Sequence, residues 1–289
     1  MRSLTRCADA LLMGGRATVP PLVEELLTRD AVVRVMLRSA DAPVSGDPEK
    51  VVADFDDPGS LRSALEGVRR AYLVTPSSER AERQQVDFVD AARGAGVERL
   101  VVLSQLGSVA DSPVRFLRYH AAVEQHVRDS GMDFTFLRPN LYFQGLFAVA
   151  GSIVGNGVLP APIGDARVSA VDVRDIAAVA AAALTDDDHG GATYTLTGPQ
   201  AITHAEMAAA LSEATGRDVR FVDVPPDDFA AVVREVLPPW QVDGLLEDYA
   251  HYRRGEASEV TDVVDTVVGR SAISFAQFVH DYADRFARP

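Results

Sequence analysis

The sequence predicts an α/β protein in which a doubly wound parallel sheet is followed by a smaller, mainly helical C-terminal lobe. Three observations predict this fold class. The first half of the chain alternates short apolar runs, rich in β-branched residues, with amphipathic helical patterns. Six of these runs follow one another at the spacing of two βαβαβ halves. The last part, from Phe221 to Pro289, has largely helical patterns.

Six strands are expected in the first half of the chain. Each apolar run is bounded by glycine, proline or charged residues, as strands of a buried parallel sheet usually are. In chain order, the expected strands cover residues 10–14, 32–38, 51–55, 71–76, 99–105 and 133–139. A further strand is expected over residues 193–198.

Helices are expected between these strands, because the intervening segments repeat apolar residues with a helical period. Pro58 and Gly59 open one helix, and Gly96 ends another. Asp172 and Asp175 are expected to cap a later helix and to tie the two lobes together. The expected helices cover residues 21–29, 58–68, 79–96, 113–131, 171–186 and 204–217.

The regular alternation of expected strands and helices ends after Pro139. Residues 151–165 are rich in glycine and proline, so we expect a long loop with short strands over the carboxyl edge of the sheet, where pocket walls often form. The expected division of the chain is a nucleotide-binding-type domain of residues 1–139 and 168–198, and a substrate lobe of residues 140–167 and 199–289.

Composition excludes several classes of protein. With 47% hydrophobic residues, the 289-residue chain can bury a full-sized core. The net charge of -14 is spread along the chain and disfavours a nucleic-acid partner, because phosphate binding needs clustered cations. Cys7 is the only cysteine, Lys50 is the only lysine, and the sequence has neither a signal-peptide pattern nor an apolar run of about 20 residues. We therefore expect a cytoplasmic protein without a membrane role.

Eight segments of the chain, taken together, point to one family. They are PLVEELL, RVMLRS, ADFDDPGSL, AYLVTPSSER, FVDAARGAGVERLVVLS, SGMDFTFLRPNLYFQ, VDVRDIAAVA and YTLTGPQAITHAEMAAALSEATGR. In this order, over nearly the whole chain, they resemble the NmrA-like branch of the atypical short-chain dehydrogenases/reductases. The resemblance implies an extended Rossmann-type fold that binds a nicotinamide dinucleotide across the carboxyl ends of the strands. Such proteins include NAD(P)H-dependent reductases, redox-sensing regulators and biosynthetic enzymes, so the resemblance determines the fold more than the activity.

The segment after the first expected strand departs from the family pattern. Relatives carry T-G-A-T-G-x-V-G there, whereas residues 13–20 of this chain read MGGRATVP. Gly14 matches the first glycine of the family pattern, but Ala17 and Pro20 replace the other two glycines. Pro20 and Pro21 also remove two N–H groups of the kind that a helix start offers to an anion.

Gly14, Arg16 and Thr18 are the expected cofactor-binding residues of this segment. Arg16 adds a positive charge near a pyrophosphate, and Thr18 offers a hydroxyl donor where an amide is lost. The alternative is that the segment opens a stable helix and binds nothing, because proline suits the first helical turn.

Three other strand ends supply candidate cofactor contacts. Arg38 and Ser39 end the second strand, where an arginine suits the 2′-phosphate of NADP and an acidic residue would prefer NAD. The resemblance implies that Asp54 and Phe55 contact the adenine and that Thr75 lines the ribose and nicotinamide. The expected cofactor is therefore NADP(H). Each residue also has an ordinary alternative as a surface charge, loop cap or packing residue.

The usual catalytic pair of short-chain reductases, a tyrosine followed four residues later by a lysine, is missing. Tyr119 is followed at that spacing by Val123. Atypical members often carry a lysine or histidine one residue along, and here this residue is His120, our candidate general acid or base. Glu124 lies one helical turn away and can tune the ring, although a surface His–Glu pair is the alternative. Ser104 ends the fifth strand, where relatives carry a substrate-binding hydroxyl.

Five residues are candidates for substrate contacts. Asn140, Tyr142 and Phe143 lie in RPNLYFQ, a stretch that resembles the pocket floor of the family. Trp240 and Tyr249 lie in the C-terminal part and can form a lid, although aromatic side chains at such spacing usually pack in a core. No metal is expected, because no HExxH motif or clustered ligand spacing occurs.

Three functions remain open from the sequence. The first is an NADPH-dependent reductase of a carbonyl, enone or quinone in bacterial secondary metabolism, with His120 or a water supplying the proton. The second is a cofactor-independent isomerase, dehydratase or cyclase acting on a polycyclic or polyketide-like metabolite. The third is a non-catalytic ligand or redox sensor. Each has a small-molecule partner, and each is compatible with a homodimer.

Overall fold

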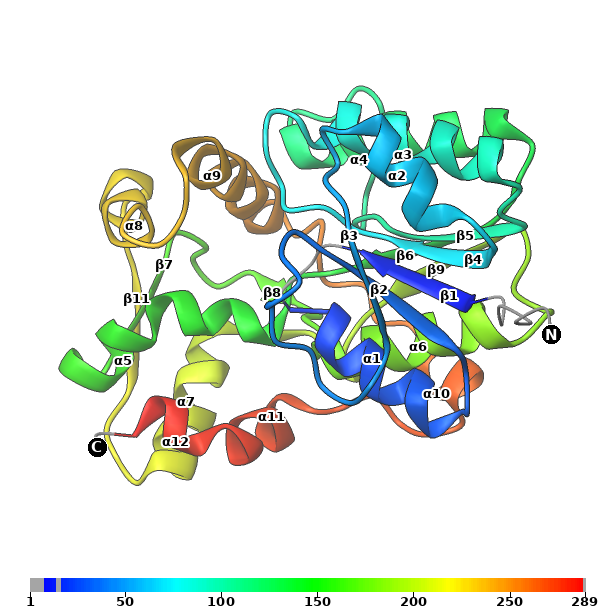
Figure 1. Cartoon of the computed structure of the whole chain (residues 1–289). Coiled ribbons are helices and arrows are strands. Elements are labelled where there is room, and N and C mark those ends of the chain that lie inside the picture. The colour runs from blue at the N-terminus through cyan, green and yellow to red at the C-terminus, as the bar shows by residue number, and fades with distance from the viewer. Residues whose placement is uncertain (1–7, 14–16, 288–289) are drawn as a thin grey trace, which may run out of the picture. The chain divides into compact units, whose positions relative to one another are not determined.

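The computed structural model, which describes residues 8–13 and 17–287, contains a seven-stranded sheet. Its strands are β1 (Ala8–Met13), β2 (Val33–Leu37), β3 (Glu49–Val52), β4 (Val68–Leu73), β5 (Arg99–Leu103), β6 (Asp133–Pro139) and β9 (Ala192–Leu196). They lie in the order β3-β2-β1-β4-β5-β6-β9, and the strands run parallel (Figure 1). The order reverses between β1 and β4, which makes this edge a topological switch point. The expected fold class is confirmed.

Helices cover both faces of this sheet. They are α1 (Val19–Thr28), α2 (Pro58–Leu65), α3 (Ala81–Ala95), α4 (Arg115–Ser130) and α6 (Val173–Thr185). Figure 1 shows α2, α3 and α4 on one face and α1 and α6 on the other. Asp57 caps α2 by accepting a hydrogen bond from the Gly59 amide at 2.9 Å, and α3 ends at Gly96, which has a φ of 80°. α2 thus begins at the expected residue but ends at Leu65, before the expected residue 68, and the expected glycine ends α3.

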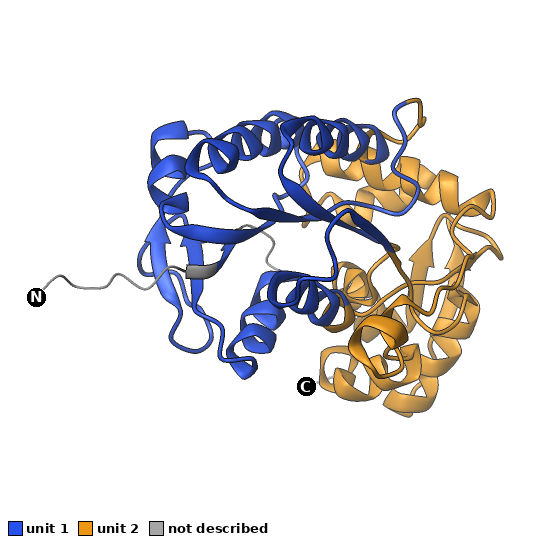
Figure 2. Cartoon of the chain, turned by 90° about the vertical axis from the view of Figure 1, so that its right-hand side faces the viewer, with its two compact units in different colours: residues 1–110, 117–138, 176–194 blue, residues 111–116, 139–175, 195–289 orange. Residues whose placement is uncertain are grey.

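The chain divides into two compact units, which Figure 2 shows in different colours. Unit 1 comprises residues 1–110, 117–138 and 176–194, and unit 2 comprises residues 111–116, 139–175 and 195–289. Unit 1 has a core between the sheet and its helices that includes Phe88, Leu100 and Phe136, all fully buried. A fully buried β5 explains why its sequence, RLVVL, is a nearly continuous apolar run.

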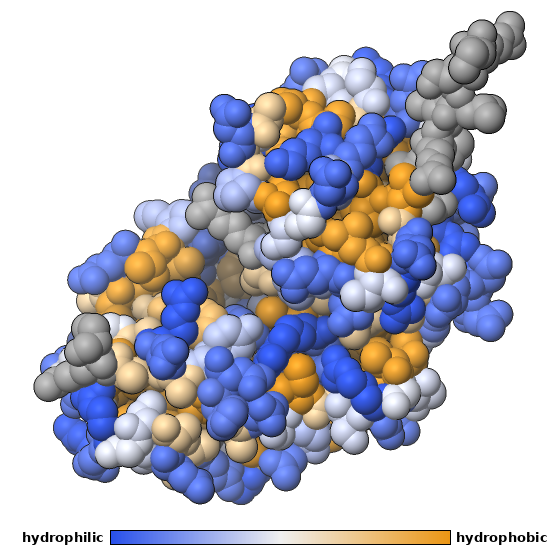
Figure 3. All heavy atoms as spheres, turned by 60° about the horizontal axis from the view of Figure 1, so that its bottom comes forward, coloured by the Kyte–Doolittle hydropathy of each residue, from blue (hydrophilic) through white to orange (hydrophobic). Residues whose placement is uncertain are grey.

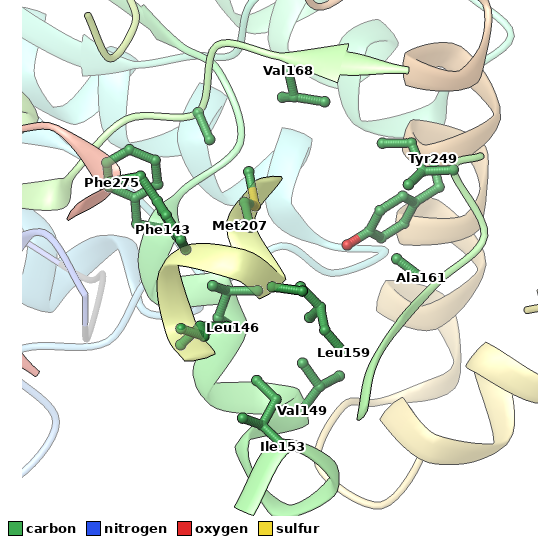
Figure 4. Packing of buried hydrophobic residues seen from close by; sticks show 14 of the residues in the cluster. Phe143, Leu146, Val149, Ile153, Leu159, Ala161, Val168, Met207, Tyr249 and Phe275 are labelled. Atoms are coloured by element: carbon green, nitrogen blue, oxygen red, sulfur yellow. The ribbon is translucent and has the colours of Figure 1, made fainter. Parts of the chain in front are cut away.

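Unit 2 is built from short helices and two small sheets. Its elements are η1 (Phe143–Val149), α5 (Ala150–Asn156), β7 (Val158–Ala161), β8 (Arg167–Val168), β10 (Ile202–Thr203), α7 (His204–Thr215), β11 (Arg220–Asp223), α8 (Pro226–Val233), α9 (Pro239–Arg253), α10 (Val263–Val268), α11 (Phe275–Asp281) and α12 (Ala283–Phe286). β7 pairs with β11, and β8 pairs with β10. Figure 4 shows part of its core, in which Phe143 lies beside Phe275 and Tyr249 points into the cluster.

The segment 151–165 differs from the expected loop, because α5 covers its first part. Ile153 is fully buried in the core of unit 2, so tertiary packing stabilises a helix that two glycines disfavour. The helix ends at Gly157, which has a φ of 65°. A Cβ atom at Gly157 would lie 2.5 Å from the carbonyl oxygen of Asp218, so only glycine fits there.

Buried arginines near the amino ends of two central strands form hydrogen bonds with backbone carbonyl groups. Arg70 on β4 donates to the carbonyl oxygens of Leu184 and Asp186, at 2.9 and 3.1 Å. Arg99 on β5 donates to the same Asp186 carbonyl at 2.7 Å and to the Asp133 carboxylate at 2.6 Å. These bonds satisfy carbonyl groups at the end of α6, which its own helical bonds leave free. They explain why arginine can occupy a buried strand position.

In the part of the chain that the structure describes, five large hydrophobic side chains are exposed. Figure 3 shows, on one face, hydrophobic areas interrupted by hydrophilic side chains. Among the described residues, the exposed large hydrophobic side chains are Val52, Val109, Val232, Val236 and Val260. None of the helices in the described ranges has the length and hydropathy that crossing a membrane requires.

Candidate functional site

A cavity of 790 Å³ in unit 1 lies at the carboxyl end of β2. Its walls are mainly apolar, and Arg38 is the only charged residue among the described residues that line it. The lining residues are Val19, Pro20, Val23, Val35, Met36, Leu37, Arg38, Ala42, Pro43, Val44, Ser45, Ala53, Phe55 and Pro76. Strand ends bring these segments together because parallel strands place their carboxyl ends at one edge. The cavity can therefore take a flat apolar ligand group next to an anion.

The start of α1 forms one side of this cavity. Thr18 precedes the helix, and Val19, Pro20 and Pro21 are its first three residues. The Thr18 hydroxyl is buried and accepts a hydrogen bond from the Tyr72 hydroxyl at 3.3 Å. Gly14 and Arg16, the other two residues expected to hold a pyrophosphate here, lie outside the described residues.

The other expected cofactor contacts are distributed around the carboxyl ends of the strands in unit 1. Arg38 is exposed, and Phe55 is buried with its ring against the cavity and against Phe88, with the two centroids 6.2 Å apart. Asp54 lies in the turn before α2, where its carboxylate accepts a hydrogen bond from the Asp56 amide at 2.9 Å. Thr75 is buried and accepts a hydrogen bond from the Gln85 side chain at 2.8 Å.

His120 lies in the first half of α4 and is buried. Its Nδ1 has no hydrogen-bond partner among the described residues. Burial lowers the pKa of His120 to about 3; the nearby Glu124 carboxylate raises it in part, and Arg138 lowers it further. The imidazole is therefore neutral at pH 7, and it can form hydrogen bonds but does not carry a proton to give as an imidazolium.

Glu124 forms the centre of a buried hydrogen-bond network in unit 1. Its carboxylate accepts hydrogen bonds from Ser104 at 2.6 Å, from Arg138 at 2.8 and 2.6 Å, and from Arg128 at 2.9 Å. Burial opposes ionisation, but the bonds from Arg138, Ser104 and Arg128 outweigh it and hold the pKa of Glu124 below its usual value. The carboxylate thus influences His120 through its charge, while its hydrogen bonds fix the ends of β5 and β6.

Two further polar side chains lie near His120. The hydroxyls of Tyr119 and Ser77 are 3.1 Å apart and share a hydrogen bond. The rings of Tyr119 and His120 lie 4.1 Å apart, between centroids. Ser77 was not among the candidate residues selected from the sequence. Its position after the Thr75-Pro76 turn, at the end of a strand, is the signal that could have indicated it.

The expected substrate residues Asn140, Phe143 and Tyr249 have partners within unit 2. The Asn140 amide donates to Ser169 and to the Ala257 carbonyl, at 2.9 and 2.8 Å, and its oxygen accepts from the Leu141 amide at 2.8 Å. Phe143 and Tyr249 are buried in the core. These three side chains hold unit 2 together, and their role toward a substrate stays a prediction.

Tyr142 and Trp240 are less buried than these three. Tyr142 forms a β-bridge with Val171, and its side chain is half-buried. Trp240 stacks against Phe116, with the ring centroids 5.3 Å apart, and Arg115 lies over the indole at 5.6 Å. Both remain candidates for substrate contact. In the described parts of the chain, no three His, Cys, Asp or Glu side chains are grouped so that they could hold a metal ion.

Comparisons with known proteins point to one family. Residues 20–275 match the model of the NmrA-like family. The chain is 35% identical to an NAD(P)H azoreductase of Xenophilus azovorans, covering 96% of this chain and 98% of the relative. It is 34% identical to (4-alkanoyl-5-oxo-2,5-dihydrofuran-3-yl)methyl phosphate reductase of Streptomyces griseus, covering 96% and 99%.

A solved structure shares the fold over almost the whole chain. It is the NADPH-dependent quinone oxidoreductase QOR2 of Escherichia coli, complexed with NADPH. The TM-score is 0.85 and the sequences are 26% identical; the match covers 95% of this chain and 99% of the other. The Rossmann-type architecture expected from the sequence is therefore shown.

Proposed function

Since the chain belongs to the NmrA-like family, we propose that it is an NADPH-dependent reductase of a small molecule. The NAD(P)H azoreductase to which it is similar supports an NAD(P)H-dependent reaction, and the dihydrofuranylmethyl phosphate reductase supports the reduction of a small molecule. A carbonyl, enone or quinone is the substrate class that we propose, since each accepts a hydride and then a proton.

The observation that carries this proposal is the composition of the cavity beside β2. Phe55 and Val19 offer apolar surface for an adenine ring, and Arg38 offers a guanidinium for a phosphate. The lining residues in the described part of the chain include no carboxylate, a group that would bind the free 2′-hydroxyl of NAD and repel the phosphate of NADP. These residues fit the 2′-phosphoadenosine end of NADP(H).

We assign the remaining roles to residues of unit 1. The nicotinamide cofactor, when bound, supplies the hydride. Neutral His120 donates a hydrogen bond to the substrate oxygen, and a water delivers the proton, because the ring is not protonated at neutral pH. Glu124 is a positioning residue that holds Ser104 and Arg138.

Replacement of Arg38 tests this proposal. In Arg38→Gln, we expect NADPH to bind at least about tenfold more weakly, because a hydrogen bond to a charged group contributes about 1.5–3 kcal/mol. NADH binding stays unchanged. The control is Arg93→Gln, which removes an exposed arginine from α3. Isothermal titration calorimetry with both cofactors checks the result. Equal affinities of wild type and Arg38→Gln for NADPH would contradict the proposed site.

A specific observation also favours a second candidate function. The prolines at the start of α1 lack the N–H groups that hold a diphosphate, and a chain that has lost its cofactor can still perform isomerisation, dehydration or cyclisation. Turnover of a substrate by extensively dialysed protein, with no nicotinamide added, would support this candidate over the reductase.

A further inference from the structure

The start of α1 offers fewer donors to a diphosphate than an ordinary helix start. The first three helical positions are Val19, Pro20 and Pro21, and only Val19 has an N–H group. The next amide, of Leu22, donates to the carbonyl oxygen of Thr18 at 3.2 Å, within the helix itself. At the first three helical positions, one amide therefore remains of the three that an ordinary helix start offers to an anion.

Among the described residues at this helix start, neither Pro20 nor Thr18 replaces the lost amides. Pro20 is exposed and lines the cavity, so it presents carbon instead of N–H to a ligand. Thr18 is 2% exposed, and its hydroxyl is held against Tyr72. Burial raises the pKa of Tyr72, so its hydroxyl keeps the proton that it donates to Thr18. The Thr18 hydroxyl is thus turned into unit 1.

Arg38, another residue that lines this cavity, is well suited to an anion. Arg38 is exposed at the end of β2, and it has no acidic neighbour among the lining residues. The apolar walls beside it supply area for burial of a base. A ligand in this cavity therefore meets the cation of Arg38 and the carbon surface of Pro20.

We infer that this chain concentrates its affinity for NADP(H) at the 2′-phosphoadenosine end of the cofactor, and that Pro20 and Pro21 reduce the contribution of the diphosphate. This inference rests on the proposed function. Because NADPH and NADH share the diphosphate, weakening its contacts makes binding depend on Arg38. Pro20 and Pro21 are then specificity-determining residues, although neither distinguishes the two cofactors by direct contact.

Calorimetric titrations with NADP⁺ and with adenosine 2′-monophosphate test this inference. The monophosphate lacks the diphosphate and the nicotinamide, so it reports on the Arg38 end alone. We expect its dissociation constant to lie within about tenfold of that of NADP⁺, because one charge-assisted hydrogen bond alone would account for a factor of about ten. Arg38→Gln weakens both ligands by a similar factor.

The double variant Pro20→Ala/Pro21→Ala returns two N–H groups to the helix start. We expect it to bind NADP⁺ at least about tenfold more tightly, while its affinity for the monophosphate changes by less than about twofold. Pro58→Ala is the matched control, because Pro58 opens α2, away from the cavity. Circular dichroism of each free protein verifies that the fold is kept.

The possible results separate the inference from the proposed function. If NADP⁺ binds more than about 100-fold tighter than the monophosphate, or if the double variant binds NADP⁺ no better than the wild type, the inference is overturned and the reductase proposal stands. If NADP⁺ does not bind, with or without binding of the monophosphate, both are overturned.

Discussion

His204 is expected to make unit 2 sensitive to acid. Its side chain is 1% exposed, and neither ring nitrogen has a hydrogen-bond partner in the described parts of the chain. The rings of Phe221 and Tyr249 lie 5.8 and 6.0 Å away. Burial lowers the pKa of His204 from 6.5 to about 4. α7 begins at this residue, and the positive end of the helix also opposes a cationic ring.

The sign and size of the effect follow from this lowered pKa. Between pH 6.5 and 4 the unfolded chain binds a proton at His204 that the folded chain does not bind, so the free energy of unfolding falls as the pH falls. Above pH 6.5 the group has no such effect. Between pH 7.5 and 5.0 the expected loss is about 2 kcal/mol, and below pH 4 it approaches about 3 kcal/mol.

Urea unfolding of His204→Leu measures this contribution. The fluorescence of Trp240, the only tryptophan, follows the unfolding of unit 2, to which both residues belong. Between pH 7.5 and 5.0, we expect the variant to lose about 2 kcal/mol less stability than the wild type. His280→Leu is the control, because the His280 side chain is 83% exposed. An unchanged pH dependence in His204→Leu would refute the reasoning.

Two predictions concern the network in α4. Glu124→Gln is expected to lower the free energy of unfolding by about 3 kcal/mol, because it removes a buried charge from its partners. Arg128→Gln, at the edge of the network, is expected to cost less than about 1 kcal/mol. Urea unfolding followed by circular dichroism compares the two variants, and equal losses of stability would contradict the central place of Glu124. His120→Ala is expected to lower kcat about 100-fold, because it removes a hydrogen-bond donor to the substrate oxygen. Because burial lowers the pKa of His120 to about 3, the wild-type kcat should have no inflection from this ring between pH 5 and 8, and an inflection near pH 6.5 that disappears in the variant would contradict its neutral state.

The layout of the sheet could be predicted because local signals repeat along the chain. Buried parallel strands read as short apolar runs, and proline, aspartate and glycine mark the helix ends. The helix α5 could not be predicted in this way, since its sequence is rich in glycine. Burial of Ile153, which depends on residues distant in sequence, stabilises it.

Part of the candidate site could also be predicted from the sequence, and part could not. Arg38 could be selected because it ends a strand of the parallel sheet, where an arginine suits the 2′-phosphate of NADP, and Phe55 because the family resemblance implies a contact with the adenine. The hydrogen-bond partners of Glu124 could not be predicted from the sequence. A spacing of four residues suggested a pair with His120, but the charged side chain of Arg138 and the hydroxyl of Ser104 bind the carboxylate instead. Hydrogen bonds to charged partners are stronger than a contact with a neutral ring.

The sequence by itself determined the α/β architecture, the arginine at the end of β2 and the two prolines at the start of α1, because each depends on local pattern or on the chemistry of a single residue. Only the tertiary structure decided that His120 and His204 are neutral and that the Asn140 amide holds unit 2 together. Burial and hydrogen-bond partners set those properties, and both come from residues far apart in the chain.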